Sequence, residues 1–221
     1  MPTRNALLVG GSGLVGRYCL QSLLADSGHD KVILLTRRPL ALSANSKLEQ
    51  KITDFENLAS LKIGAVETVF CALGTTIKKA GSQAAFRHVD FEIPLAVAKL
   101  GLQSGARQFV LVSSVGANAD SSNFYLRTKG ELERELCALP FVAVHIFRPS
   151  FLVGQREEVR LGERLAIPIT RAFQLLMAGP LRRYRSIQAE SVGKAMVAAA
   201  NSGKNETNVY EYDQIVKLAG G

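Results

Sequence analysis

The stretch Gly10-Gly11-Ser12-Gly13-Leu14-Val15-Gly16 stands between an apolar run, Ala6–Val9, and a segment whose apolar residues recur at helical spacing. A strand, a glycine loop and a helix are the simplest account of this order. Helix-like segments separate four further apolar runs, at residues 32–36, 68–73, 109–112 and 141–147. Short apolar runs that alternate with helices are typical of a parallel sheet covered on both faces. The sequence therefore predicts an α/β fold with a doubly wound parallel sheet, the Rossmann fold.

The composition is that of a folded globular chain. Hydrophobic residues make up 47% and charged residues 21% of 221 residues, which excludes disordered, collagen-like and coiled-coil classes. This length predicts a single domain spanning residues 1–221. Lys and Arg exceed Asp and Glu by eight, a balance that by itself favours a polyanionic partner. The chain contains no Trp and no recognition motif for nucleic acid, so we expect no nucleic-acid partner.

The cysteines and the N-terminus indicate the compartment. Three widely spaced cysteines, without a C-x-x-C pair or a nearby histidine pair, predict reduced thiols and no metal site. The N-terminus has no apolar signal segment, and no apolar run approaches the length of a membrane span. We therefore expect a cytoplasmic protein without a membrane partner.

The glycine loop has the spacing G-x-x-G-x-x-G. Glycines at a strand–helix junction allow a tight turn and a close approach of backbone to a pyrophosphate, and the helix start offers free N–H groups. The loop therefore predicts a dinucleotide site, the alternative being a strand–helix turn without a ligand. Its candidate binding residues are Gly10, Ser12, Gly13, Leu14 and Val15.

The end of the second strand carries Arg37 and Arg38, with no carboxylate to accept hydrogen bonds from the ribose hydroxyls of NAD. Two guanidinium groups can instead clamp a 2'-phosphate, so the sequence favours NADP(H). The alternative is that both arginines are solvated. Asp54, after another short strand, is a candidate acceptor for the adenine amino group, or equally a helix N-cap. Leu73 and Gly74 end the next strand, where backbone can pass close to the cofactor, the alternative being a simple turn glycine.

Tyr125 and Lys129 are four residues apart in a helical segment, and the stripe continues through Leu132 and Leu136. Because that stripe must face the sheet, Lys129 is predicted to point inward. An inward lysine favours tyrosinate, so Tyr125 can exchange a proton with a carbonyl or alcohol oxygen. Ser114 follows the strand at residues 109–112 and is preferred over Ser113 for holding that oxygen. The alternative is a packed phenol beside an amphipathic lysine.

Longer strings of residues carry a family resemblance. They are Cys71-Ala72-Leu73-Gly74-Thr75-Thr76, Lys79-Ala80-Gly81, Ser113-Ser114, Ser121-Ser122-Asn123-Phe124, the pair Tyr125 and Lys129, and Phe147-Arg148-Pro149. With the glycine loop, they resemble the atypical branch of the short-chain dehydrogenase/reductase superfamily over essentially the whole chain. The closer likeness is to the Tat-interacting protein family of NADPH-binding, oxidoreductase-like proteins.

The resemblance implies a role for most of these positions. Residues 12–15 would contact the pyrophosphate, Arg37 and Arg38 the 2'-phosphate, and residues 73–74 the middle of the cofactor. Tyr125 would be the proton acceptor and Lys129 would bind the nicotinamide ribose. Backbone around Leu152 would border the nicotinamide, and Arg160 would reach a phosphate. In related enzymes a helix asparagine often completes a proton relay, and residues 86–90 supply none.

Residues 151–190 are expected to contribute most of a small C-terminal substrate lobe. Residues 151–185 contain seven arginines against three glutamates, which would suit an anionic substrate. An apolar stripe at residues 161–176 predicts a helix that roofs the site or faces a partner subunit, the alternative being an ordinary core helix whose neighbouring arginines are solvated. The sequence thus favours an NADPH-dependent oxidoreductase acting on a small carbonyl compound. The alternative is an NADPH-binding regulatory or redox-sensing protein that acts through a protein partner.

Overall fold

A computed structural model of the chain describes residues 4–154 and 179–220. Its main feature is a seven-stranded sheet in the order β3-β2-β1-β4-β5-β6-β9, in which every neighbouring pair is parallel. The strands are β1 (Ala6–Val9), β2 (Val32–Thr36), β3 (Leu48–Ile52), β4 (Thr68–Cys71), β5 (Gln108–Val112), β6 (Ala143–Phe147) and β9 (Glu206–Tyr210). The predicted doubly wound α/β fold is confirmed.

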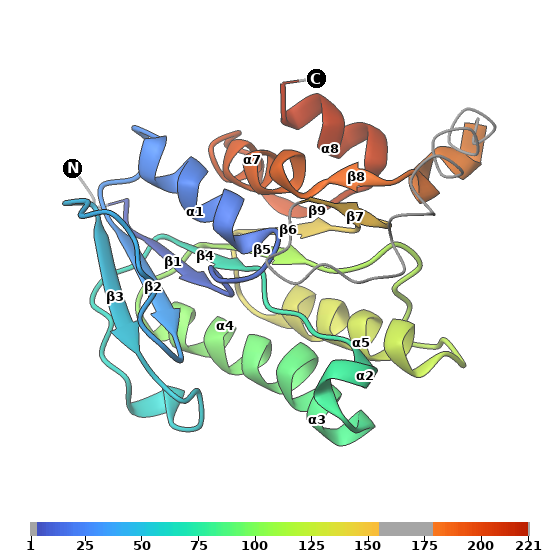
Figure 1. The fold of residues 1–221 in the computed structure, drawn as a ribbon, viewed down its shortest axis with the longest axis horizontal. Helices are drawn as coiled ribbons and strands as arrows, with labels where there is room; N and C mark the ends of the chain where they lie inside the picture. Colours follow the sequence, from blue (N-terminus) through green and yellow to red (C-terminus); the bar gives the residue numbers. More distant parts are fainter. Residues whose placement is uncertain (1–3, 155–178, 221) are drawn as a thin grey trace.

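Helices cover both faces of this sheet. Figure 1 shows α1, α7 and α8 on one face and α4 and α5 on the other. The longer helices are α1 (Gly16–Ala25), α4 (Ile93–Gln103), α5 (Phe124–Ala138), α7 (Ala189–Ala200) and α8 (Tyr212–Leu218). The short ones are α2 (Ile77–Ala80), α3 (Gln83–Arg87) and the 3-10 turns η1 (Leu58–Ser60) and η3 (Gly179–Tyr184).

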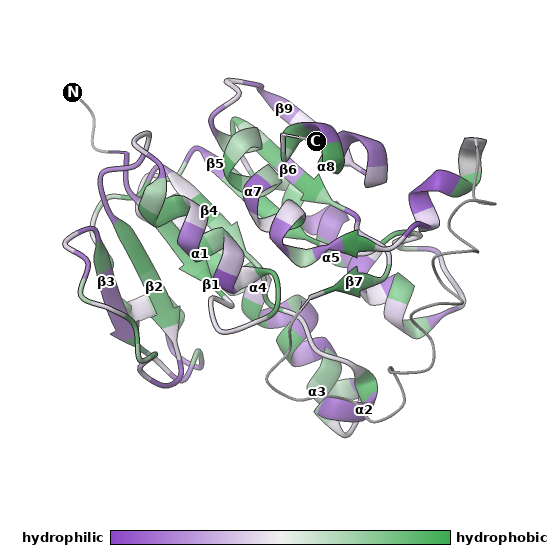
Figure 2. Cartoon of the chain, turned by 45° about the horizontal axis from the view of Figure 1, so that its top comes forward, coloured by the Kyte–Doolittle hydropathy of each residue, from purple (hydrophilic) through white to green (hydrophobic). Residues whose placement is uncertain are grey.

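The strand sequences explain the two layers. Alternate side chains of a strand point to opposite faces, and both faces of β1 are buried: Ala6 and Leu8 pack toward α1 and α7, whereas Leu7 and Val9 pack toward α4. A strand buried on both sides has no room for polar residues, which explains its continuous apolar run. The central strands are accordingly hydrophobic in Figure 2, whereas the edge strand β3 carries hydrophilic residues.

The order in which successive strands join the sheet reverses at β1. Strands β2 and β3 follow on one side of β1, and the chain then returns to place β4 on its other side. In open parallel sheets such a reversal leaves a crevice beyond the carboxyl ends of the two strands, where ligands bind. The glycine loop after β1 and the Leu73-Gly74 turn after β4 therefore meet at the crevice of this sheet.

One helix contains a π turn. Residues His88–Glu92 form the π turn η2 between α3 and α4, and Pro94 lies in the first turn of α4. Pro94 has no N–H, so the carbonyl of Asp90, four residues earlier, lacks its α-helical donor. The wider turn follows from this loss and turns the side chain of Asp90 into the interior, where it is fully buried.

Two predicted strand boundaries are wrong. The run at residues 141–147 begins as a strand at Ala143, because Phe141 lies before it and packs against the ring of Phe109 with centroids 5.5 Å apart. The run at residues 68–73 ends as a strand at Cys71, so Leu73 and Gly74 lie in the turn that follows it.

The predicted lobe is described in part. Strands β7 (Leu152–Val153) and β8 (Ile187–Gln188) form a small parallel sheet beside η3. The expected helix at residues 161–176 lies outside the described residues.

Candidate functional site

The glycine loop is pressed against the end of β4. Gly10 has a φ of +82°, and a Cβ atom there would lie 2.5 Å from the carbonyl carbon of Ala72. A Cβ atom at Gly16 would lie 2.0 Å from the carbonyl oxygen of Gly10. Both positions therefore require glycine. No side chain caps the start of α1, so the positive end of its dipole is available to an anion at the crevice, although the N–H groups of Arg17 and Tyr18 already donate to carbonyl oxygens of the loop.

The arginine pair stands at the neighbouring strand end. Arg37 and Arg38 follow β2 directly, both side chains are exposed, and neither forms an ion pair with any described residue. Thr36 donates from its hydroxyl to the carbonyl oxygen of Arg38 at 2.8 Å, which fixes the turn. Asp54 is exposed and its carboxylate accepts the N–H of Glu56 at 3.0 Å, so it stabilises its own turn.

Helix α5 carries the predicted tyrosine and lysine. Lys129 is 3% exposed, which confirms that it points inward. The ring of Tyr125 packs against Phe86 with centroids 5.5 Å apart. Asn123 caps the helix by accepting the N–H of Leu126 at 3.1 Å, and this cap fixes where the helix begins. The cap thus sets the position of Tyr125 close to the helix start.

Asp90 is the residue of this site that the sequence reasoning missed. Its carboxylate is fully buried, and Oδ1 lies 2.7 Å from Nζ of Lys129. Oδ2 accepts the backbone N–H of Thr75 at 2.9 Å. Burial by itself lowers the pKa of Lys129, but the attractions of Asp90 and Tyr125 outweigh it, so the pKa lies above its ordinary value. Lys129 is therefore a charged ammonium.

The turn after β4 lies directly over this ion pair. A Cβ atom at Gly74 would be 3.6 Å from Oδ1 of Asp90 and 3.8 Å from Nζ of Lys129. Gly74 is exposed, so the ion pair is separated from the crevice by little more than one backbone segment. The predicted residues Leu73 and Gly74 thus lie where β1, β4 and α5 converge.

The two serines after β5 have different environments. Ser113 is 6% exposed, and its hydroxyl donates to Oε1 of Glu133, which is also bound by the guanidinium of Arg148. Ser114 is partly exposed, and its hydroxyl lies 3.4 Å from the carbonyl oxygen of Val115. Ser113 therefore serves the packing of α5 on the sheet, and Ser114 retains a hydroxyl for a ligand.

The lobe approaches the glycine loop through β7. A Cβ atom at Gly154, just after Leu152 and Val153, would lie 2.9 Å from Cδ1 of Leu14. Leu152 therefore lies close to the glycine loop. Arg160 lies outside the described residues.

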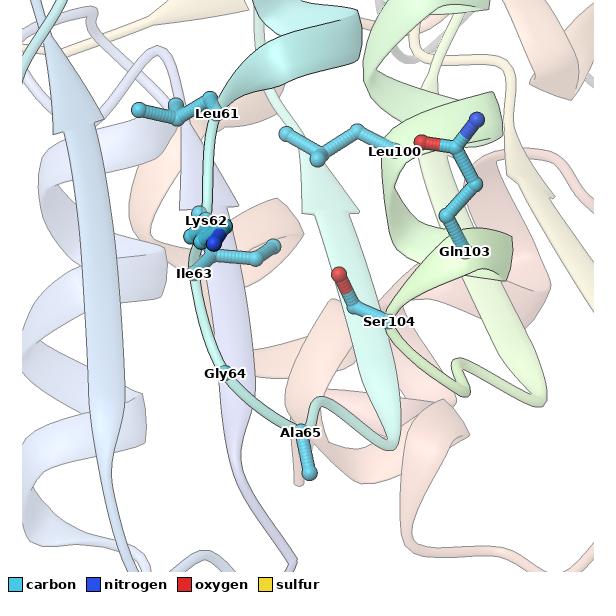
Figure 3. A pocket seen from close by; sticks show the side chains of 8 residues that line it. All are labelled: Leu61, Lys62, Ile63, Gly64, Ala65, Leu100, Gln103 and Ser104. Atoms are coloured by element: carbon cyan, nitrogen blue, oxygen red, sulfur yellow. The ribbon is translucent and has the colours of Figure 1, made fainter.

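A hollow elsewhere on the surface is unrelated to this crevice. It has a volume of about 460 Å³ and lies between the loop before β4 and the end of α4, as Figure 3 shows. Its lining includes Ile63, Ala65 and Ser104. These residues lie near the amino end of β4, whereas the glycine loop lies at the carboxyl ends of the strands.

Sequence comparison assigns the family. The HIM1 family model matches residues 37–177, more than half of the chain. The chain belongs to the HIM1 family. It is 36% identical to protein HTATIP2 of Rattus norvegicus, over 75% of this chain and 70% of the relative. It is 32% identical to the mitochondrial protein FMP52 of Candida albicans, over 97% of this chain and 98% of the relative. The resemblance to the Tat-interacting protein family is confirmed.

Solved structures share the fold of this HIM1-family chain. A UDP-N-acetylglucosamine 4-epimerase from Methanobrevibacter ruminantium has a TM-score of 0.69 at 15% identity, over 96% of this chain and 77% of that one. The human epimerase family protein SDR39U1, solved with NADPH, has a TM-score of 0.65 at 17% identity, over 94% and 74%. The HIM1-family chain thus shares the Rossmann-like fold of these epimerase-family structures.

The comparisons correct the expected location. Several FMP52 relatives of this HIM1-family chain are named mitochondrial, so the expectation of a cytoplasmic protein is wrong. Among residues 4–154 and 179–220, no helix has the length and apolar character needed to cross a membrane.

Proposed function

We propose that this HIM1-family protein is an NADPH-dependent oxidoreductase that reduces a small carbonyl compound, with Tyr125 as the proton donor. The observation that carries the proposal is the convergence of three features at one crevice. These are the glycine loop at the reversal point of the sheet, the exposed Arg37 and Arg38 at the neighbouring strand end, and the inward Lys129 beside Tyr125.

The chain's own groups fit a nicotinamide dinucleotide. Four glycines leave the loop with little side-chain bulk, so a pyrophosphate could lie against its backbone. Arg37 and Arg38 are free to clamp the 2'-phosphate of NADPH. Leu73 and Gly74 would lie along the middle of the cofactor, Leu152 beside the nicotinamide, and Asp54 beside the adenine.

The chemistry follows from the positions of two hydroxyl groups and one ammonium. The bound nicotinamide would supply a hydride to the carbonyl carbon. Ser114 would hold the carbonyl oxygen, and the Tyr125 hydroxyl would donate the proton that this oxygen takes up. Lys129 would bind the nicotinamide ribose and favour the tyrosinate left after proton transfer. The arginines of residues 151–185 favour an anionic carbonyl substrate.

Replacement of the tyrosine tests the reaction. In Tyr125→Phe we expect NADPH to bind within about threefold of wild type and NADPH oxidation across a carbonyl panel to fall by on the order of 100-fold or more. Tyr212→Phe on α8, across the sheet, is the matched control and should retain turnover. Turnover retained in Tyr125→Phe would refute the assignment.

The arginine pair tests the cofactor preference. Arg37→Asp combined with Arg38→Ala should weaken NADPH binding by on the order of 100-fold, because two charge-assisted contacts are lost, and leave NADH binding nearly unchanged. Arg107→Ala serves as the control, because it removes an exposed arginine at the amino end of β5, away from the carboxyl ends of the strands where Arg37 and Arg38 lie. Equal losses for both cofactors would exclude a 2'-phosphate site.

A regulatory protein of the same fold is the second candidate. Its support is the relative HTATIP2, whose name denotes a Tat-interacting protein. A chain that binds NADPH and reports its level to a protein partner or to a second copy needs the crevice but not the Tyr125 hydroxyl. Cofactor binding without turnover on any carbonyl, and partner binding unchanged in Tyr125→Phe, would favour this second function.

A further inference from the structure

The ion pair beneath Gly74 joins three separate elements. Asp90 comes from the π turn η2, Lys129 from α5, and the Thr75 N–H from the turn after β4. Asp90 is fully buried and Lys129 is 3% exposed. Two ionised groups removed from water are retained at a cost in desolvation, which the 2.7 Å contact and the added hydrogen bond offset.

The pair changes the net charge beneath the crevice. An isolated Lys129 would place one positive charge there, whereas the pair with Asp90 has a net charge of zero. A Cβ atom at Gly74 would touch both charged atoms, at 3.6 and 3.8 Å, so no side chain of that turn screens them from the crevice. Because water is partly excluded around the pair, an uncancelled charge on either residue would change the electrostatic potential several ångströms away, in the crevice.

The two oxidation states of a nicotinamide differ in one charge, because the oxidised ring is a cation and the reduced ring is neutral. We propose that Asp90 sets the relative affinity of this crevice for the oxidised and the reduced cofactor, by cancelling the charge of Lys129 next to the nicotinamide. This inference rests on the proposed cofactor site. It assigns to Asp90 an electrostatic role that requires no contact with the cofactor.

The role predicts opposite effects from the two halves of the pair. Removal of the carboxylate charge in Asp90→Asn should weaken NADP⁺ binding relative to NADPH, raising the ratio of their dissociation constants on the order of tenfold. Removal of the ammonium in Lys129→Met should lower that ratio. The double variant Asp90→Asn/Lys129→Met again has no net charge at this position. Its ratio of dissociation constants should therefore return toward that of wild type, even if it binds both cofactors more weakly.

The experiment measures dissociation constants of NADP⁺ and NADPH by calorimetry for wild type and the three variants. Glu92→Gln is the matched control: it removes a carboxylate charge from the same π turn, but its side chain is 55% exposed and pairs with His88 at the surface. The ratio should not change in this control, because solvent screens the charge.

The outcomes separate the two proposals. If wild type binds neither cofactor, the proposed function fails. If wild type binds both, and the two affinities change by the same factor in Asp90→Asn and in Lys129→Met, Asp90 and Lys129 have a structural role and the inference is overturned. The double variant keeps the test valid if Asp90→Asn alone does not fold, because it leaves no unpaired buried charge. The inference is supported if the ratio of the NADP⁺ and NADPH dissociation constants is close to wild type in the double variant and lowered in Lys129→Met.

Discussion

His145 in β6 is a fully buried histidine, and its removal should change how the stability of the protein depends on pH. Its Nδ1 atom lies 3.0 Å from the hydroxyl of Tyr210, and the two rings stack with centroids 5.9 Å apart. Burial, with a smaller contribution from the charge of Lys204, lowers the pKa of His145 from 6.5 to about 4. The folded protein therefore holds this imidazole neutral over a range in which the unfolded chain protonates it.

The sign and size follow from proton linkage. Between pH 6.5 and about pH 4 the unfolded chain binds more protons at His145 than the folded protein, so stability is present above pH 6.5 and is lost as the pH falls. A shift of this size corresponds to about 3 kcal/mol of unfolding free energy across the window. The pKa of His29 is also lowered, chiefly by burial, and acts in the same direction.

The assay is urea denaturation of wild type and His145→Gln at several pH values in that window. Glutamine does not titrate, so the wild-type unfolding free energy should fall by about 3 kcal/mol more than that of the variant. Contributions common to both proteins, including that of His29, cancel in this difference. His88→Gln is the control, because His88 lies at the surface. Parallel curves for wild type and His145→Gln would refute the reasoning.

Two further substitutions follow from contacts. Gly10→Ala should abolish binding of NADPH in a fluorescence titration, because the added Cβ would lie 2.5 Å from the carbonyl carbon of Ala72 at a φ of +82°; binding within threefold of wild type would contradict this. Glu133→Ala should lower the unfolding free energy in urea by about 2–3 kcal/mol, since it leaves Arg148 unpaired beside a buried hydroxyl. Glu190→Ala, in an exposed pair, should change it by less than about 0.5 kcal/mol, and equal effects would argue against a structural role for Glu133.

The outcome for Lys129 shows what periodicity can predict. Its inward direction followed from the stripe it shares with Leu132 and Leu136, and all three side chains are buried. Helical spacing fixes which side chains share a face, so this much is a local property. The choice of Ser114 over Ser113 is different in kind. It depends on Glu133 and Arg148, which engage Ser113 after α5 and β6 have packed together.

Asp90 escapes prediction from the sequence because the residue type expected on this helix is asparagine. The sequence around a carboxylate in an amphipathic segment does not show whether its side chain is exposed at the surface or buried in an ion pair. The relevant local signal was Pro94, which deprives the carbonyl of Asp90 of its donor and favours the π turn.

The sequence by itself determined the layered α/β fold, the glycine loop, and the arginine pair at a strand end. These features depend on alternating apolar runs, on the backbone freedom of glycine, and on chain order, all of which are local. Only the tertiary structure decided that the charge of Lys129 is cancelled by Asp90 beneath Gly74. The physical reason is that an ion pair between distant residues is defined by how helices pack, and its effect depends on burial, which no local pattern specifies.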